Sequence, residues 1–324
     1  MKLKTALISM AVVTCSVQPT IAQADGGPVL FGNLNAGIQK VQGETDLDGQ
    51  AFEASIGVKG AYKKDDFLML YKLEAEFTEA VNNEEGKSDL EIKNASIVFP
   101  TKYGVFVIEP RGESAHQRDL YGAVDIFENN EADNSTLWGQ PDEGSSVFAY
   151  VTPAFNNIVV KAAVLTLNSE GTPNSNYNQN DVDVFDIRVL YENEGLRIGL
   201  GNSAASAKQT GANDTFNTTA FTLGYELGNT HLGLTWEHQG DHPAPFDSDT
   251  DVIGVVADVK LNDGWSVGMG YTDKDSEHDA WDDSATTVIV RKQILENVYA
   301  YAEGADYKEN TVSDNFSIGI NVSF

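Results

Sequence analysis

Apolar and polar residues alternate with a period of two along almost the whole chain, and this constrains the fold more than any other feature. The last segment, FSIGINVSF, places Phe, Ile, Ile, Val and Phe on one face and Ser, Gly, Asn and Ser on the other. Such alternation predicts strands with one apolar face. Similar runs lie near 30–38, 52–59, 67–77, 90–99, 103–110, 146–153, 157–167, 182–191, 196–202, 217–227, 230–238, 252–261, 264–272, 285–292, 296–305 and 312–324. No segment has a convincing helical period.

The connections between these runs alternate between short and long. Short connections lie at 62–66, 100–102, 153–157, 192–195, 228–230, 262–264 and 293–296; longer polar ones lie at 41–50, 81–88, 110–144, 168–180, 203–216, 239–250, 274–283 and 306–311. Strands that face lipid on one side and water on the other, with short turns at one end and long loops at the other, are typical of outer-membrane barrels. The sequence therefore predicts an all-β fold, a transmembrane antiparallel β-barrel of about sixteen strands.

The N-terminus has the features of a secretory signal peptide. Lys2 and Lys4 precede a short apolar core, and Ala22-Gln23-Ala24 fits a cleavage site. We expect a signal peptide at 1–24, cleavage near Ala24, and a single barrel domain at 25–324. Cleavage would remove Cys15, the one cysteine, so disulfides are not expected. The formal net charge of −28 argues against nucleic acid as a partner.

The chain resembles the Gram-negative general diffusion porins. The resemblance covers essentially the whole chain after the signal peptide and is carried by the opening strand LFGNLNAG at 30–37, the terminal Asn321-Val322-Ser323-Phe324, and the long loop Pro110–Gly144. It implies that this third outer loop folds into the lumen, that three barrels form a homotrimer in outer-membrane lipid and lipopolysaccharide, and that the terminal motif is read by the barrel-assembly machinery. The candidate assembly signal is Phe316, Val322 and Phe324.

The loop Pro110–Gly144 is acidic and interrupts the alternation, and long loops of this kind are usually functional or disordered. If it lies inside the barrel, its charges face those strand residues that point inward. The candidate constriction residues of the loop are Glu113, Arg118, Asp119, Asp125 and Glu128. The candidate basic residues of the wall are Lys59, Lys72, Arg111, Arg188 and Arg197, with Lys161 a further inward-phase lysine. Acids outnumber bases in the loop, which predicts a preference for cations; the alternative is that the acids are merely solvated loop charges.

Other functions are less well supported by the sequence. Nucleophile-elbow, H-E-x-x-H and phosphate-loop motifs are missing, so no enzyme is expected. The acidic stretch 247–251 lacks EF-hand spacing and His238 with His242 lacks a third ligand, so no metal or other cofactor is expected. A solute-selective channel, an adhesive or structural outer-membrane barrel, and a soluble periplasmic β-sandwich remain alternatives. Aromatic residues near strand ends, including Tyr299 and Tyr301, are predicted to form interfacial girdles.

Overall fold

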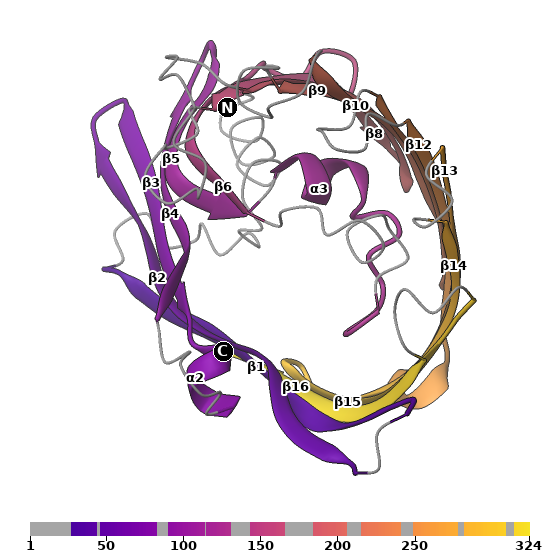
Figure 1. Cartoon of the computed structure of the whole chain (residues 1–324). Coiled ribbons are helices and arrows are strands. Elements are labelled where there is room, and N and C mark those ends of the chain that lie inside the picture. The colour runs from indigo at the N-terminus through magenta and orange to yellow at the C-terminus, as the bar shows by residue number, and fades with distance from the viewer. Residues whose placement is uncertain are drawn as a thin grey trace, which may run out of the picture.

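A computed structural model describes residues 27–43, 46–82, 90–113, 115–130, 143–165, 184–205, 215–240, 249–277, 282–308 and 314–324. These residues form a closed barrel of sixteen antiparallel strands, each paired with its sequence neighbours, and β1 pairs with β16 (Figure 1). The strands are β1 (Val29–Val41), β2 (Asp48–Lys64), β3 (Phe67–Glu76), β4 (Glu91–Thr101), β5 (Gly104–Glu113), β6 (Glu143–Val151), β7 (Ile158–Leu165), β8 (Val184–Asn193), β9 (Leu196–Ala205), β10 (Phe216–Leu227), β11 (Thr230–Gly240), β12 (Thr250–Lys260), β13 (Trp265–Ser276), β14 (Asp283–Leu295), β15 (Val298–Tyr307) and β16 (Asn315–Ser323). The predicted fold class is confirmed.

The alternation in the sequence becomes an inner and an outer face of the wall. In β8, Phe185, Ile187 and Val189 are exposed, whereas the intervening Asp186 and Arg188 are buried. Since successive side chains of a strand point to opposite faces, the apolar set lies outside the barrel and the charged set inside. Closure pairs every strand on both edges, which leaves no open sheet edge.

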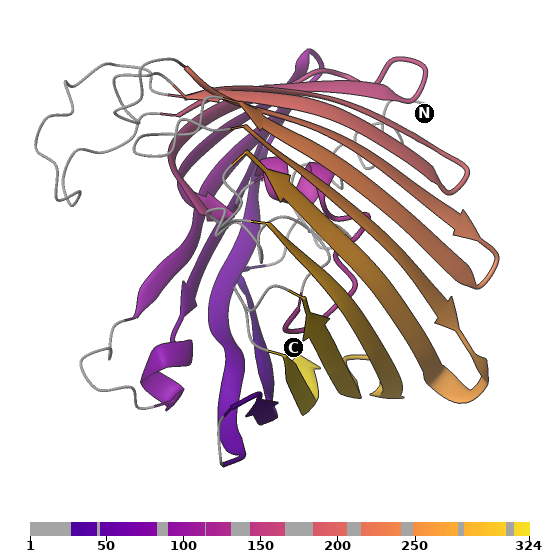
Figure 2. The same cartoon turned by 45° about the vertical axis from the view of Figure 1, so that its right-hand side comes forward.

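The short turns gather at one end of the barrel (Figure 2). Their tight geometry needs residues with positive φ, a conformation that glycine adopts most easily. Glu194 and Gly195 have φ values of 46° and 85°, and Asp263 and Gly264 have values of 57° and 73°. The Asn-Glu-Gly and Asn-Asp-Gly sequences therefore form the tight turns that their composition predicts.

In the described part of the chain, three short helical segments lie between strands, where the sequence shows no helical period. They are α2 (Thr78–Asn82), α3 (Ala115–Leu120) and the 3-10 turn η1 (Asn262–Gly264). Segments this short cannot display an amphipathic repeat, so sequence periodicity does not detect them. Within the described residues, none of the helices is long and apolar enough to cross a membrane.

The C-terminal residue completes the join between the first and last strands. The backbone N–H of Phe324 donates to the carbonyl of Gly32, and that of Gly32 donates back to Phe324, each at 3.1 Å. The side chain of Phe324 is 60% exposed, and Phe316 is also exposed on the outer face. The last strand therefore closes the barrel through backbone pairing while keeping its apolar side chains outside.

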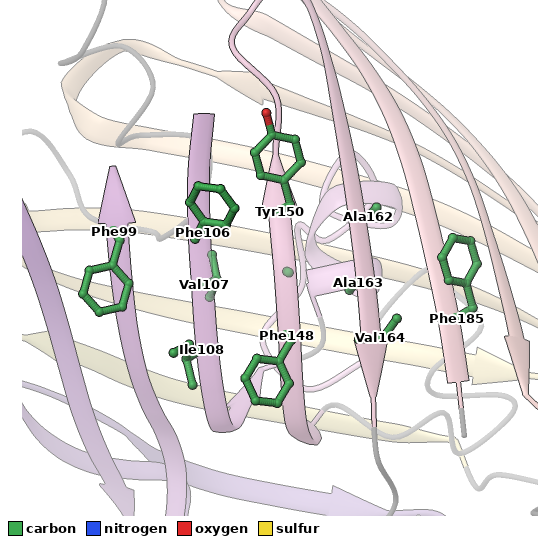
Figure 3. A pocket seen from close by; sticks show the side chains of 11 residues that line it. Phe99, Phe106, Val107, Ile108, Phe148, Tyr150, Ala162, Ala163, Val164 and Phe185 are labelled. Carbon is green, nitrogen blue, oxygen red and sulfur yellow. The ribbon is translucent and has the colours of Figure 1, made fainter. Parts of the chain in front are cut away.

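The outer face of β4 to β8 carries an aromatic groove of about 400 Å³. Figure 3 shows the rings of Phe99, Phe106, Phe148 and Tyr150 on neighbouring strands, with Phe185 beyond the small side chain of Ala162. The rings of Phe106 and Tyr150 lie 5.1 Å apart between centroids. This surface belongs to the continuous apolar band on the outside of the wall, which suits contact with hydrocarbon.

Candidate functional site

The described part of the long loop lies inside the ring of strands (Figure 1). After β5 it forms α3 and then a turn in which the N–H groups of Val124 and Asp125 donate to the carbonyl of Tyr121, at 2.8 and 3.1 Å. It continues to Asn130 beside β15 and β16, which it contacts through hydrogen bonds. The loop thus runs along the inner wall from β7 and β8 to β16. Residues 131–142 lie outside the described residues.

The first fixed point of the loop is the carboxylate of Asp119. It lies 2.8 Å from Nζ of Lys161 on β7 and 2.8 Å from a guanidinium nitrogen of Arg188 on β8. Nε of Arg188 also lies 2.7 Å from Asp186. All four side chains are at most 6% exposed, so the ion pairs are shielded from water. Pairing of this kind offsets the cost of removing the charges from water.

Arg197 on β9 fixes the end of α3 through the backbone. One guanidinium nitrogen donates to the carbonyls of Arg118 and Asp119, at 3.2 and 2.9 Å. The last carbonyls of a helix have no partner within the helix, and a cation is favourable there. Arg197 therefore stabilises the C-terminal end of α3 against the wall.

The second fixed point is Glu128. Its carboxylate accepts hydrogen bonds from Nε of Arg291 on β14 at 3.1 Å and from the hydroxyl of Tyr299 on β15 at 2.9 Å. Arg291 is shared, because another of its nitrogens lies 3.6 Å from Asp258 on β12. The loop is thus held at both ends of its described course by pairing with inward side chains of the wall.

Glu303 on β15 binds the loop backbone next to this point. Its two carboxylate oxygens accept the N–H groups of Glu128 at 2.6 Å and Asn129 at 3.0 Å. The side-chain amide of Asn130 donates to the same carboxylate at 2.8 Å. Three donors therefore converge on one buried acceptor, so its hydrogen-bonding capacity is met by neutral N–H groups.

Tyr299 and Tyr301 also face inward, so the prediction that they belong to an interfacial girdle is wrong. The hydroxyl of Tyr301 donates to Asn35 at 2.9 Å and accepts from Asn129 at 3.2 Å. Both tyrosines share the strand phase of Glu303, and a charged residue in that phase marks the face away from lipid. The alternation along β15, with Glu303 on the same face, therefore indicates that these two tyrosines point into the barrel.

The apolar side chains of the loop pack against the wall. Leu120, Val124 and Phe127 are buried in a cluster with Leu190, Ala220, Val256 and Ile289. Glycines in the strands make room for this contact: a Cβ on Gly233 would overlap the carbonyl of Ala123, and one on Gly199 would lie 3.1 Å from Leu120. The close approach of loop and wall depends on these missing side chains.

The wall formed by β1 to β4 carries further charged groups. Lys59 and Lys72 are directly opposite each other in β2 and β3, and both ammonium groups lie over the ring of Phe31, at 4.8 and 5.5 Å. Lys72 pairs with Glu74 at 2.7 Å. On the same wall, Lys93 lies 3.0 Å from Glu53 and 3.7 Å from Glu76.

The structure brings some of the candidate residues together and separates others. Asp119, Arg188 and Arg197 meet at α3, whereas Lys59 and Lys72 lie on β2 and β3. Nε of Arg111 donates to the carbonyl of Ile92 at 3.2 Å, and Asp125 is exposed. The side chain of Glu113 lies outside the described residues. Arg291, Glu303 and Asn130 were missed, and the first two could have been found from the inward phase of β14 and β15.

Residues 6–312 match the family described as Gram-negative porin. A search of curated proteins gave no match. Similar solved structures include Salmonella typhi OmpF in complex with daunomycin (TM-score 0.75, 13% identity, covering 93% of this chain and 98% of that one). An anion-selective porin from Comamonas acidovorans has a TM-score of 0.73 and 15% identity, covering 92% and 99% of the two chains.

The trimer form of Vibrio cholerae OmpT is similar too, with a TM-score of 0.67 and 17% identity, covering 92% of this chain and 99% of that one. At these identities the structural likeness establishes the fold alone. The family match spans most of the chain and agrees with the closed barrel and its apolar outer face. The protein therefore belongs to the Gram-negative porin family and is a non-enzymatic channel of the outer membrane.

Proposed function

We propose that this porin forms a water-filled pore for passive diffusion of small hydrophilic solutes and ions, with a preference for cations. A barrel of sixteen strands is wide enough for an aqueous channel. Charged groups at the narrowest part of such a channel bias which ions pass. The loop that contains Asp119, Asp125 and Glu128 is the candidate for that narrow part, because its described residues lie inside the barrel.

The observation that carries the cation preference is the charge balance where the loop meets β12, β14 and β15. Glu128, Asp258 and Glu303 converge there, and Arg291 is shared between the first two. Among the described residues no cation lies within ion-pair distance of Glu303, whose partners are neutral N–H groups. On the other wall, Lys93 pairs with both Glu53 and Glu76.

Reversal potentials of the purified protein in a planar bilayer, across a tenfold KCl gradient, test this proposal. The expected sign is that of a potassium-preferring channel. The Glu128→Gln variant should move the potential toward zero, while Glu296→Gln, an exposed change in a short turn, should leave it unchanged. A wild-type potential of the opposite sign would mean that Lys59 and the other wall cations dominate.

We also propose that the chain is exported, cleaved near Ala24, and assembled as a homotrimer. The Ala22-Gln23-Ala24 sequence supports the cleavage, and the trimer form of the similar OmpT supports the assembly state. N-terminal sequencing of the outer-membrane protein should begin near Asp25. Cross-linking in membranes should give a band of three subunits, and a monomer alone would contradict the assembly.

The outward Phe316, Val322 and terminal Phe324 are proposed as the signal read by the barrel-assembly machinery. All three lie in or directly after β16, the strand that pairs with β1 to close the barrel. The side chains of Phe316 and Phe324 are exposed. Phe324→Ala should reduce the yield of folded barrel in cells, whereas refolding of the purified variant into detergent should be nearly unaffected. Equal losses in both assays would assign the residue to stability instead of recognition.

A further inference from the structure

A pocket of about 440 Å³ lies where the loop passes the short-turn end of the barrel. It is lined by Gly122 and Ala123 of the loop, by the β8–β9 turn, and by residues of β9, β10 and β11. His231, at the start of β11, connects these parts. Its Nε2 lies 2.7 Å from the carbonyl oxygen of Ala123, and its Nδ1 lies 2.7 Å from the carboxylate of Glu226 on β10.

Both atoms that face the imidazole are hydrogen-bond acceptors. A carbonyl oxygen and an ionised carboxylate have no proton to donate, and a neutral imidazole has only one N–H. The two contacts of His231 can therefore both be hydrogen bonds when the ring carries two protons. With a neutral ring, one nitrogen lone pair would face an oxygen lone pair at 2.7 Å.

The backbone of the wall brings Ala123 into this position. Gly224 and Gly233 are directly opposite each other in β10 and β11. A Cβ on Gly233 would overlap the Ala123 carbonyl, and a Cβ on Gly224 would lie 3.3 Å from that of Ala123 and 3.8 Å from the ring of His231. The paired glycines thus leave space for Ala123, and this places the Ala123 carbonyl oxygen next to His231.

Charged groups of both signs surround the ring. Glu226 on β10 contacts it, and Asp258 is its register partner on β12. Arg197 on β9 and Glu192 at the end of β8 line the same pocket. The Nε atom of Arg197 lies 3.6 Å from a carboxylate oxygen of Glu192. The guanidinium of Arg197 is occupied by the carbonyls of Arg118 and Asp119.

We propose that His231 is a positioning residue for the long loop that follows β5. When its ring is doubly protonated, His231 binds the loop at the carbonyl of Ala123; when the ring is neutral, this contact is weaker. This inference rests on the channel function proposed above. Histidine changes its charge between about pH 5 and 8. The one proton of a neutral ring is favoured on Nδ1, beside the charged carboxylate of Glu226, so it is the hydrogen bond from Nε2 to Ala123 that is lost as the pH rises. The channel then leaves its fully open level more often.

Single-channel recording of the whole protein between pH 5 and 8.5 tests the proposal, with closed-time fraction as the readout. For the wild type, the open-to-closed ratio should fall about fivefold as the pH rises, the change that loss of one hydrogen bond of ordinary net strength predicts. His231→Gln should show a flat profile, because an amide does not titrate in this range. Glu226→Gln, which keeps an acceptor but removes the charge, should reduce the pH dependence.

His238→Gln is the matched control, since His238 also contacts a carboxylate, that of Asp251 at 3.2 Å, but lies near the other end of β11 in the outward phase of Leu232 and Trp236. It should keep the wild-type profile. A flat wild-type profile, or an unchanged profile in both His231→Gln and Glu226→Gln, would overturn the proposal. Loss of the profile in His238→Gln would also overturn it. Absence of conductance at every pH would instead refute the channel function, which keeps the two failures distinct.

Discussion

The carboxylate of Glu303 accepts the backbone N–H of Glu128 at 2.6 Å, joining two residues that are 175 positions apart in the sequence. It also accepts the N–H of Asn129. Glu303→Ala would leave these partly buried donors without their acceptor, at a cost of about 1–3 kcal/mol for each unsatisfied group. We expect the free energy of unfolding to fall by about 2–5 kcal/mol, measured by urea titration in detergent with tryptophan fluorescence.

Asp306→Ala provides the control for Glu303→Ala. Asp306 lies on the same strand, but its side chain is exposed and faces outward. Exposed substitutions of this kind usually change stability by less than about 0.5 kcal/mol. If the two variants lost the same stability, the hydrogen bonds of Glu303 to the loop would contribute nothing measurable.

Asp119→Asn should destabilise the protein strongly. The substitution keeps the side-chain size but leaves Lys161 and Arg188 as buried cations, each 2.8 Å from the carboxylate in the native protein. Removing one partner of a buried ion pair typically costs about 3–5 kcal/mol. The same urea titration measures the loss. Adding Lys161→Met, which removes one of the two buried cations that contact Asp119, should recover part of it; a double variant less stable than the single one would contradict this explanation.

The barrel could be predicted from the sequence because its signal is local. Alternation within each segment identifies a strand, and the lengths of the connections identify the two ends of the barrel. Even the turn geometry at Glu194-Gly195 and Asp263-Gly264 follows from short-range preferences. None of these inferences needs to know which distant residues meet.

The partners of the loop could not be predicted in the same way. Asp119 and Glu128 were singled out as acids, yet nothing local to them indicates that the first meets Lys161 and Arg188 and the second Arg291. Those contacts depend on the path of the loop across the lumen, which is set by packing on glycines in separate strands. Period and composition carry no information on such a path.

Gly233→Ala should narrow the channel. The added methyl group would overlap the carbonyl of Ala123 and push the loop away from the wall, toward the lumen. We expect lower single-channel conductance in planar bilayers than for the wild type. Gly304→Ala is the matched control, because a Cβ there has no neighbour nearer than 3.5 Å and makes ordinary contacts. Conductance lowered equally in both variants would mean that the effect does not arise from the contact between position 233 and Ala123.

Shortening the loop should have the opposite effect on conductance. Deleting residues 121–129 removes the segment that runs along the inner wall between the ion pairs of Asp119 and the hydrogen bonds of Asn130, so more of the lumen becomes available to water and ions. The control deletes an equal length, residues 206–214, from the connection between β9 and β10. Single-channel conductance in 1 M KCl should rise in the first variant and stay near the wild-type value in the second. If the first deletion left conductance unchanged, the loop would not limit the pore, and its carboxylates could not govern ion preference.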